Sequence, residues 1–389
     1  MTKIILLDID GVLVHPGGYR AALRATVNHF VGHSIEIDEA ILFDLERRGI
    51  SSEWDMVPLL LASYWNSILT QKPMHDLPDD VSAAALEIQH RAPLDGTHSF
   101  SVPEFNLMEG QYPAESAFHA GCYSSIPYGL QKNLLTETRN VRISHTMRIF
   151  QNHSLGTENF ESTYQMRADL DTESFLLAYD KSNIDESFRA KLLQPGIFPV
   201  AFTARPSAPP RGISDSSLGY APEAELGLAL AGLENIPIMA FGKLEYVARY
   251  HGLDPVRLIK PSPVHALAAV IAAVTGDEWF AVQSAVDWYQ TGQLKDAPLK
   301  IPGTFDLIVI EDTLGGIRST QSAGEVLNLA GFKVNVNLFG LTSGNIKKAE
   351  AFKQAGVPHF EYWDSLAERI LPMILSGQDF QKRYNRQNF

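Results

Sequence analysis

The stretch Ile4-Ile-Leu-Leu-Asp8-Ile-Asp10-Gly11 decides the fold of this chain. Its four apolar residues predict a strand buried on both faces, as in a parallel sheet, and Gly11 permits a turn after it. Asp8 then stands at the end of that strand, where a cation or several hydrogen-bond donors must offset its lost hydration. Because ligands of open α/β sheets bind at the carboxyl ends of the strands, Asp8 and Asp10 indicate a cation-binding site.

Composition is typical of a soluble globular protein. The chain has 389 residues, of which 45% are hydrophobic and 20% charged, and this length suits two or three domains of about 150 residues each. The net charge is −13 and no run of Lys and Arg stands out, so we expect a small-molecule partner and neither nucleic acid nor a membrane. Cys122 is the only cysteine, which excludes an internal disulfide and suggests a reducing, cytoplasmic location.

Periodicity divides the chain into a helical insertion and an alternating α/β part. Helical spacing predicts helices over 19–30, 37–48, 56–69 and 81–90, whereas 91–129 shows no clean period and is interpreted as irregular structure. From residue 197 onward, strands and helices alternate, with strands expected at 197–202, 236–241, 256–259, 307–310, 333–338 and 359–362. The polar tail from Ser376 is expected to be disordered.

We therefore predict an α/β fold with a doubly wound, Rossmann-like parallel sheet. Its core comprises residues 1–14 and 196–389, and a large, mainly helical domain over 15–195 is inserted after the first strand. The N-terminal apolar run is too short for a signal-peptide core, and no apolar run reaches the roughly 20 residues of a membrane span.

Three further segments place polar residues just beyond predicted strands. Thr203 follows the strand at 197–202, and the backbone N–H groups of Ala204 and Arg205 after it can meet an anion. Lys260 follows the predicted strand at 256–259, and Glu311-Asp312 ends the strand that begins at Leu307. Four carboxylates without Cys or His ligands favour magnesium, and the lysine, the metal and the N–H groups then suit a phosphate.

Taken singly, each of these residues also fits a structural role. An acid pair can belong to a solvated turn, a strand-end threonine and a lysine are ordinary surface features, and acids at a helix start are favoured by the helix dipole. Ser52-Glu53-Trp54-Asp55, between two inserted helices, is a weaker candidate for a site, because Trp54 in a core with the acids as helix caps explains it as well. Only the ordered set of four segments is specific.

In that order, Asp8-Ile-Asp10, Thr203, Lys260 and Glu311-Asp312 resemble motifs one to four of the haloacid dehalogenase-like superfamily. Residues 15–195 resemble the superfamily's helical cap, although they are much longer than usual. Haloacid dehalogenases lack the second aspartate, so Asp10 makes the chain resemble the phosphatase and phosphomutase branches.

The resemblance implies a role for each residue. Asp8 would be the nucleophile that forms an aspartyl-phosphate, and Asp10 the acid that protonates the leaving oxygen and then activates water. Thr203 and Lys260 would hold the phosphoryl group, with Ala204 and Arg205 as further substrate-binding candidates. Mg²⁺ would be held by the Asp8 carboxylate, the main-chain carbonyl of Asp10, and the acids that follow the 307–310 strand, Asp312 and, in support, Glu311.

The expected function is therefore magnesium-dependent hydrolysis of a small phosphomonoester, by a monomer or a homodimer. Two alternatives stay open at this point. A phosphomutase or phosphotransferase would use the same residues with another acceptor, and a non-catalytic member would use the insertion as a binding surface. The substrate is not readable, because specificity in this architecture would come from the inserted domain.

Overall fold

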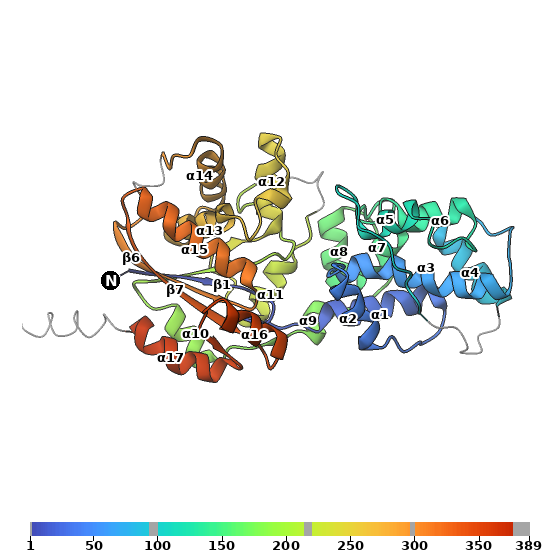
Figure 1. Ribbon diagram of the computed structural model, residues 1–389, viewed down its shortest axis with the longest axis horizontal. Helices are drawn as coiled ribbons and strands as arrows, with labels where there is room; N and C mark the ends of the chain where they lie inside the picture. The colour runs from blue at the N-terminus through green and yellow to red at the C-terminus, as the bar shows by residue number, and fades with distance from the viewer. Residues whose placement is uncertain (1, 93–99, 214–219, 296–299, 376–389) are drawn as a thin grey trace, which may run out of the picture. The chain divides into compact units, whose positions relative to one another are not determined.

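The computed structural model describes residues 2–92, 100–213, 220–295 and 300–375. It divides into two compact units: Met1–Pro16 with Asp180–Phe389, here called the sheet unit, and Gly17–Tyr179, here called the helical unit (Figure 1). The segment expected to be irregular lies partly, and the tail from Ser376 entirely, outside the described residues. No described helix is long and apolar enough to cross a membrane.

The sheet unit is built on six parallel strands, which confirms the predicted α/β fold. Their order is β5-β4-β1-β6-β7-β8, so β1 lies in the middle and pairs with β4 on one side and β6 on the other. Leu7, the last residue of β1, lies opposite Ala201 and Ile310. The strands are β1 (Thr2–Leu7), β4 (Ile197–Phe202), β5 (Ile238–Met239), β6 (Thr304–Glu311), β7 (Lys333–Leu341) and β8 (His359–Phe360).

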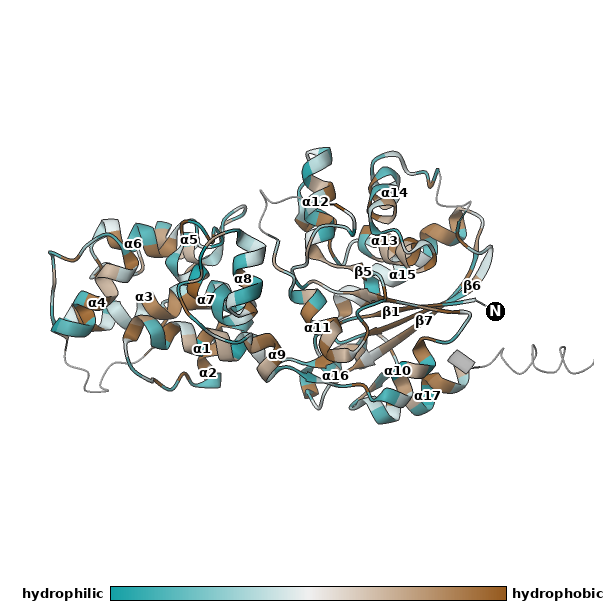
Figure 2. Ribbon diagram, turned by 180° about the vertical axis from the view of Figure 1, so that it is seen from behind, coloured by the Kyte–Doolittle hydropathy of each residue, from teal (hydrophilic) through white to brown (hydrophobic). Residues whose placement is uncertain are grey.

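Helices cover both faces of this sheet because the residues of β1 alternate between two cores. Ile4 and Leu6 pack against one helical layer, and Ile5 and Leu7 against the other; the central strands are accordingly brown in Figure 2. The first layer contains α12 (Phe241–His251), α13 (Pro263–Thr275), α14 (Glu278–Thr291), α15 (Leu314–Leu329) and α16 (Ile346–Gln354). The second contains α10 (Glu186–Leu192), α11 (Glu223–Ala231) and α17 (Trp363–Leu375).

The insertion ends earlier than the sequence analysis placed it. The two connections to the helical unit pair as a short antiparallel ribbon, β2 (Val14–His15) with β3 (Lys181–Ser182). After β3, α10 turns Phe188 and Leu192 into the core of the sheet unit. Residues 180–195 therefore belong to the sheet unit, because the apolar pair spaced by one helical turn packs there.

The helical unit packs around a core that includes Phe30, Trp65 and Tyr123. Helices α1 (Gly18–Val31), α2 (Glu39–Arg47), α3 (Glu53–Gln71) and α4 (Val81–Arg91) match the four predicted ones. The others are α5 (Pro113–His119), α6 (Tyr128–Leu135), α7 (His145–Leu155), α8 (Thr157–Tyr164) and α9 (Phe175–Tyr179). The expectation of irregular structure is wrong for α5, whose seven residues are too few to show a period and which begins at Pro113.

The first turn of α3 has a structural role within the helical unit. Trp54 packs against the core of that unit, and the buried carboxylate of Asp55 accepts hydrogen bonds from Nε and Nη2 of Arg139, at 3.2 and 2.5 Å. Arg139 also lies over the ring of Trp54. These contacts account for both residues, as a core aromatic and a paired acid.

Candidate active site

The order in which the chain adds strands to the sheet changes direction beside β1, and the candidate site lies at this point. From β1 the chain crosses to β4 on one side, whereas β6 is followed by β7 on the other. The carboxyl ends of β1 and β6 therefore border the crevice in which ligands of such sheets bind. Asp8 stands at the end of β1 and donates its N–H to the carbonyl of Ile310, at 3.1 Å, which brings Asp8 beside Glu311 and Asp312.

Asp8, Glu311 and Asp312, here called the acid cluster, offer carboxylate oxygens that all lie within 4.8 Å of one another. The three residues are 4%, 0% and 9% exposed. Burial, and then the charge of Asp312, raises the pKa of Asp8 to about 6 despite the nearby Lys260. Burial also raises the pKa of Glu311 and of Asp312. The cluster is thus a set of buried acids that repel one another and lack sufficient positive charge.

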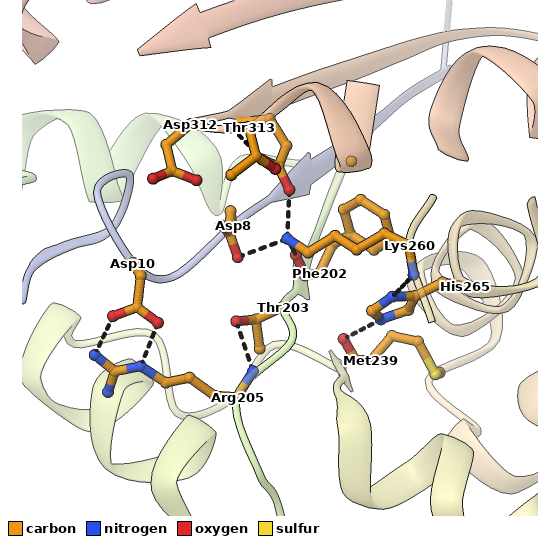
Figure 3. A network of polar contacts seen from close by, with 12 residues as sticks. Asp8, Asp10, Phe202, Thr203, Arg205, Met239, Lys260, His265, Asp312 and Thr313 are labelled. Atoms are coloured by element: carbon orange, nitrogen blue, oxygen red, sulfur yellow. Dashed lines mark hydrogen bonds and ion pairs between the residues drawn. The ribbon is translucent and has the colours of Figure 1, made fainter. Parts of the chain in front are cut away.

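Two lysines compensate the acid cluster in part. Nζ of Lys260 lies 3.1 Å from Oδ1 of Asp8 (Figure 3) and forms an ion pair with Glu311. Lys348 of α16 forms an ion pair with Asp312. Burial would lower the pKa of Lys260, but the charges of Asp8 and Glu311 outweigh burial and raise it. Two ammonium groups face three carboxylates, so an ionised cluster keeps an excess of negative charge.

The acid cluster has the properties of a divalent-cation site. Oδ1 of Asp8 is buried and accepts no hydrogen bond from any described residue, and its ion pair with Lys260 is shared with Glu311. Carboxylate oxygens are the ligands that Mg²⁺ prefers. Gly11 leaves room beside the cluster: it has φ +73°, and a Cβ atom there would lie 2.9 Å from Oδ2 of Asp312. The residues present therefore fit Mg²⁺.

Lys260 reaches the site from a turn, so the predicted strand at 256–259 is wrong. Asp254 accepts a hydrogen bond from the N–H of Val256 and caps a single 3₁₀ turn, η1 (Pro255–Arg257), in which Val256 is solvent-exposed. Leu258 is buried in the core, and Ile259 packs against it while partly exposed. Pro255 favours this outcome because its fixed φ suits the first position of a helical turn.

His265, which the sequence analysis did not identify, fixes the backbone of Lys260. The N–H of Lys260 donates to Nδ1 of His265 at 3.3 Å, and the other ring nitrogen lies 3.0 Å from the carbonyl of Met239. Since Nδ1 accepts, Nε2 must carry the proton and donate. Burial, and then the charge of Lys260, lowers the pKa of His265 to about 3, which keeps the ring neutral.

The loop after β4 carries the second half of the site. Thr203 is buried at the end of β4, and its hydroxyl accepts a hydrogen bond from the N–H of Arg205 at 3.3 Å. Ala204 is exposed. The guanidinium of Arg205 is turned toward Asp10 and donates to both of its carboxylate oxygens, from Nε at 2.8 Å and from Nη2 at 2.5 Å. Asp8 and Asp10 thus have different partners, as Figure 3 shows.

Three side chains that bind the predicted residues were missed: His265, Lys348 and Asp180. Lys348 lies in the first turn of α16, just beyond β7, and its place after a strand is the one signal that could have identified it. Nothing in the sequence marks Asp180 or His265. The predicted ligation by the main-chain carbonyl of Asp10 stays a prediction.

Comparisons with known proteins add little to this geometry. No family model and no curated protein matches the sequence. Among solved structures, the chain is similar to a conserved haloacid dehalogenase-like protein of unknown function from Agrobacterium tumefaciens, with 14% sequence identity over 96% of this chain and 99% of that one. The TM-score is 0.33, and a likeness this weak supports no conclusion about fold or function.

Proposed function

We propose that this chain is a magnesium-dependent phosphohydrolase of the haloacid dehalogenase-like type, which cleaves a small phosphomonoester through an aspartyl-phosphate on Asp8. The observation that carries the proposal is the convergence of Asp8, Glu311 and Asp312 around Lys260, at the crevice between β1 and β6. With Thr203, these residues come from four segments that are far apart in the sequence, and they are groups of the kind that phosphoryl transfer uses.

The acid cluster would hold Mg²⁺ through the carboxylates of Asp8 and Asp312, with Glu311 in support. When bound, the ion supplies positive charge that offsets the repulsion between a carboxylate and a phosphate dianion. Lys260 contributes to the same end from the protein, because its ammonium lies 3.1 Å from Oδ1 of Asp8 and remains charged.

Asp8 would act as the nucleophile. Its carboxylate oxygen would attack phosphorus as the bond from phosphorus to the ester oxygen breaks, and Asp10 would donate a proton to that oxygen as it leaves. Asp10 would then take a proton from a water molecule that attacks phosphorus, which releases phosphate and restores Asp8. Asp10 fits this second role because its side chain is 33% exposed, whereas Asp8 is buried beside the cation site.

A panel of phosphomonoesters tests the proposal, with Asp8→Asn as control. We expect the purified protein to release phosphate from at least one small ester with Mg²⁺, and to lose this activity with a chelator or in Asp8→Asn. Product analysis with phosphosugars separates release of free phosphate from its transfer to another hydroxyl. No hydrolysis of any ester, or hydrolysis that Asp8→Asn leaves undiminished, would contradict the proposal.

A further inference from the structure

Arg205 was expected to bind substrate, but its guanidinium is committed to the protein. The side chain is 1% exposed. Nη2 donates to Asp180 at 2.8 Å as well as to Asp10, and Nη1 donates to the carbonyl of Glu223 at 3.4 Å. Gly227 of α11 allows this position, because a Cβ atom there would lie 3.2 Å from Nη1 of Arg205. Arg205 is thus held in place by Asp180 and by the carbonyl of Glu223, which do not belong to the acid cluster.

The geometry leaves part of the Asp10 carboxylate accessible. A carboxylate offers about four lone-pair positions, and a bidentate arginine uses one on each oxygen. Asp10 remains 33% exposed, whereas Arg205 and Asp180 are 1% exposed in their side chains. The arginine therefore fixes the plane of the carboxylate while part of it faces solvent.

We propose that Arg205 is the positioning residue for Asp10, with Asp180 as the anchor that keeps the guanidinium in place. The inference rests on the proposed function and replaces substrate binding as the role of Arg205. Without the guanidinium, the Asp10 side chain would rotate freely, and proton transfer to the leaving oxygen would lose its orientation. Asp180 is the residue at which the chain re-enters the sheet unit, so the anchor lies beside the β2–β3 ribbon.

The kinetic test compares two esters that differ in their need for a proton. An alkyl phosphate leaves as a poorly stabilised alkoxide, whereas p-nitrophenyl phosphate leaves without protonation. The comparison uses kcat/KM, which reports the steps up to departure of the leaving oxygen, because kcat also includes the later attack of water that both esters share. General acid catalysis contributes about 10²-fold or more, so we expect Arg205→Lys to lower kcat/KM for the alkyl ester by about that factor, with a much smaller loss for the aryl ester. Asp180→Asn should show the same pattern more weakly.

Arg211→Lys is the matched control. Arg211 lies on the same loop and donates to the main-chain carbonyls of Glu234 and Ile236, at 3.0 and 2.7 Å. Its replacement should affect the two esters equally. Equal losses of kcat/KM for both esters in Arg205→Lys, or a loss that comes from a higher KM alone, would overturn the positioning role and favour a structural or substrate-binding one.

A crystal structure of Arg205→Lys provides a readout that does not depend on turnover. We expect the Asp10 carboxylate to lie in a different rotamer, or in several, while Asp8 keeps its place. An Asp10 carboxylate that stays in the same orientation would refute the inference even in an active protein. A wild-type protein that hydrolyses no ester would instead refute the proposed function, and the crystal structure would still decide whether Arg205 orients Asp10.

Discussion

Two sets of charges in the sheet unit, each with a buried lysine and a buried glutamate, differ in how completely their charges and hydrogen bonds are paired. In the Lys243 network, formed by Arg211, Glu225, Lys243 and Glu278, Lys243 donates to Glu225 at 2.9 Å and to the carbonyl of Ala208 at 2.7 Å. Both oxygens of Glu278 accept main-chain N–H groups at 2.9 Å. Two positive charges meet two negative ones. In the acid cluster, three carboxylates meet two lysines, and Oδ1 of Asp8 accepts no hydrogen bond from a described residue.

The difference separates structural charge from functional charge. A network whose charges and hydrogen bonds balance holds a loop in place and has no need of a ligand. A set that keeps a negative excess, and whose buried Asp8 shares its lysine with Glu311, is stabilised by a cation that arrives from solution. We therefore expect substitutions in the Lys243 network to affect stability and substitutions in the acid cluster to affect activity.

The largest expected effect is the loss of turnover in Asp8→Asn. Removal of a nucleophile lowers kcat by a factor of about 10³ or more. The melting temperature without Mg²⁺ should stay the same or rise, since the change removes one of three acids that repel one another. Steady-state kinetics and thermal unfolding of the same preparation check both parts, and a lower melting temperature with normal turnover would reverse the assignment.

Lys243→Met should show the opposite pattern. The change leaves the buried Glu278 and the partly exposed Glu225 without their common partner, and breaking a buried pair costs about 3–5 kcal/mol of unfolding free energy. Turnover per folded molecule should stay within a few-fold of wild type. Urea unfolding together with active-site titration tests this, and a loss of turnover without a loss of stability would place Lys243 in the site.

Mg²⁺ should stabilise the wild-type protein. Binding to the folded state alone adds about 2.7 kcal/mol at a free concentration of 100 times Kd, which thermal unfolding across a Mg²⁺ series measures. Asp312→Asn should abolish the shift, whereas Glu225→Gln, in the balanced network, should retain it. A shift of the same size in both variants would mean that the ion binds elsewhere.

Acid should weaken the protein through His265. Its pKa is about 3 in the folded state against roughly 6.5 when unfolded, so the unfolded state binds more protons between these values. This contribution to stability is complete above about pH 6.5 and declines as the pH falls, by about 2 kcal/mol between pH 8 and pH 5. The raised pKa values of Asp8, Glu311 and Asp312 act in the opposite direction over this range, so the test compares two proteins. By urea unfolding, the stability of wild type relative to His265→Gln should fall by about 2 kcal/mol from pH 8 to pH 5, and an unchanged difference would contradict a buried neutral ring.

The smallest expected effect is a difference in Mg²⁺ affinity between alanine variants of two glycines with positive φ, Gly11 and Gly252. Gly11→Ala and Gly252→Ala should each lose about 1–2 kcal/mol of stability, because alanine is strained in the left-handed region. Only Gly11 faces Asp312; a Cβ atom at Gly252 would meet nothing within 4 Å. Calorimetric titration should therefore show weaker Mg²⁺ binding in Gly11→Ala alone, and unchanged binding would argue against a cation beside Gly11.

The parts of this architecture that depend on local patterns are predictable from the sequence. β1, β4 and β6 are continuous apolar runs because parallel strands are buried on both faces, and the polar residues that follow them reach one edge of the sheet. Lys260 reaches the site although its strand is absent, because it precedes α13, which packs on the sheet. In each case the apolar run or helix that positions the polar residue lies within a few residues of it in the sequence.

Contacts between distant segments are not readable in this way. Arg205 and Asp10 are 195 residues apart, and their pairing depends on how the loop after β4 turns. Asp180 joins them only because the insertion ends there, earlier than the sequence indicated. Lys348 looks like one of several surface lysines until α16 is placed beside β7. A single sequence does not indicate which of these distant residues will be in contact.

Trapping the covalent intermediate tests the central claim most directly. The protein would be quenched in acid during turnover of its best phosphomonoester with Mg²⁺, reduced with borohydride and digested, and the peptide that contains residue 8 analysed by mass spectrometry. An aspartyl-phosphate is reduced to homoserine, so the account predicts homoserine at position 8 only when ester and Mg²⁺ are both present. Phosphate release with an unmodified Asp8 throughout would contradict it.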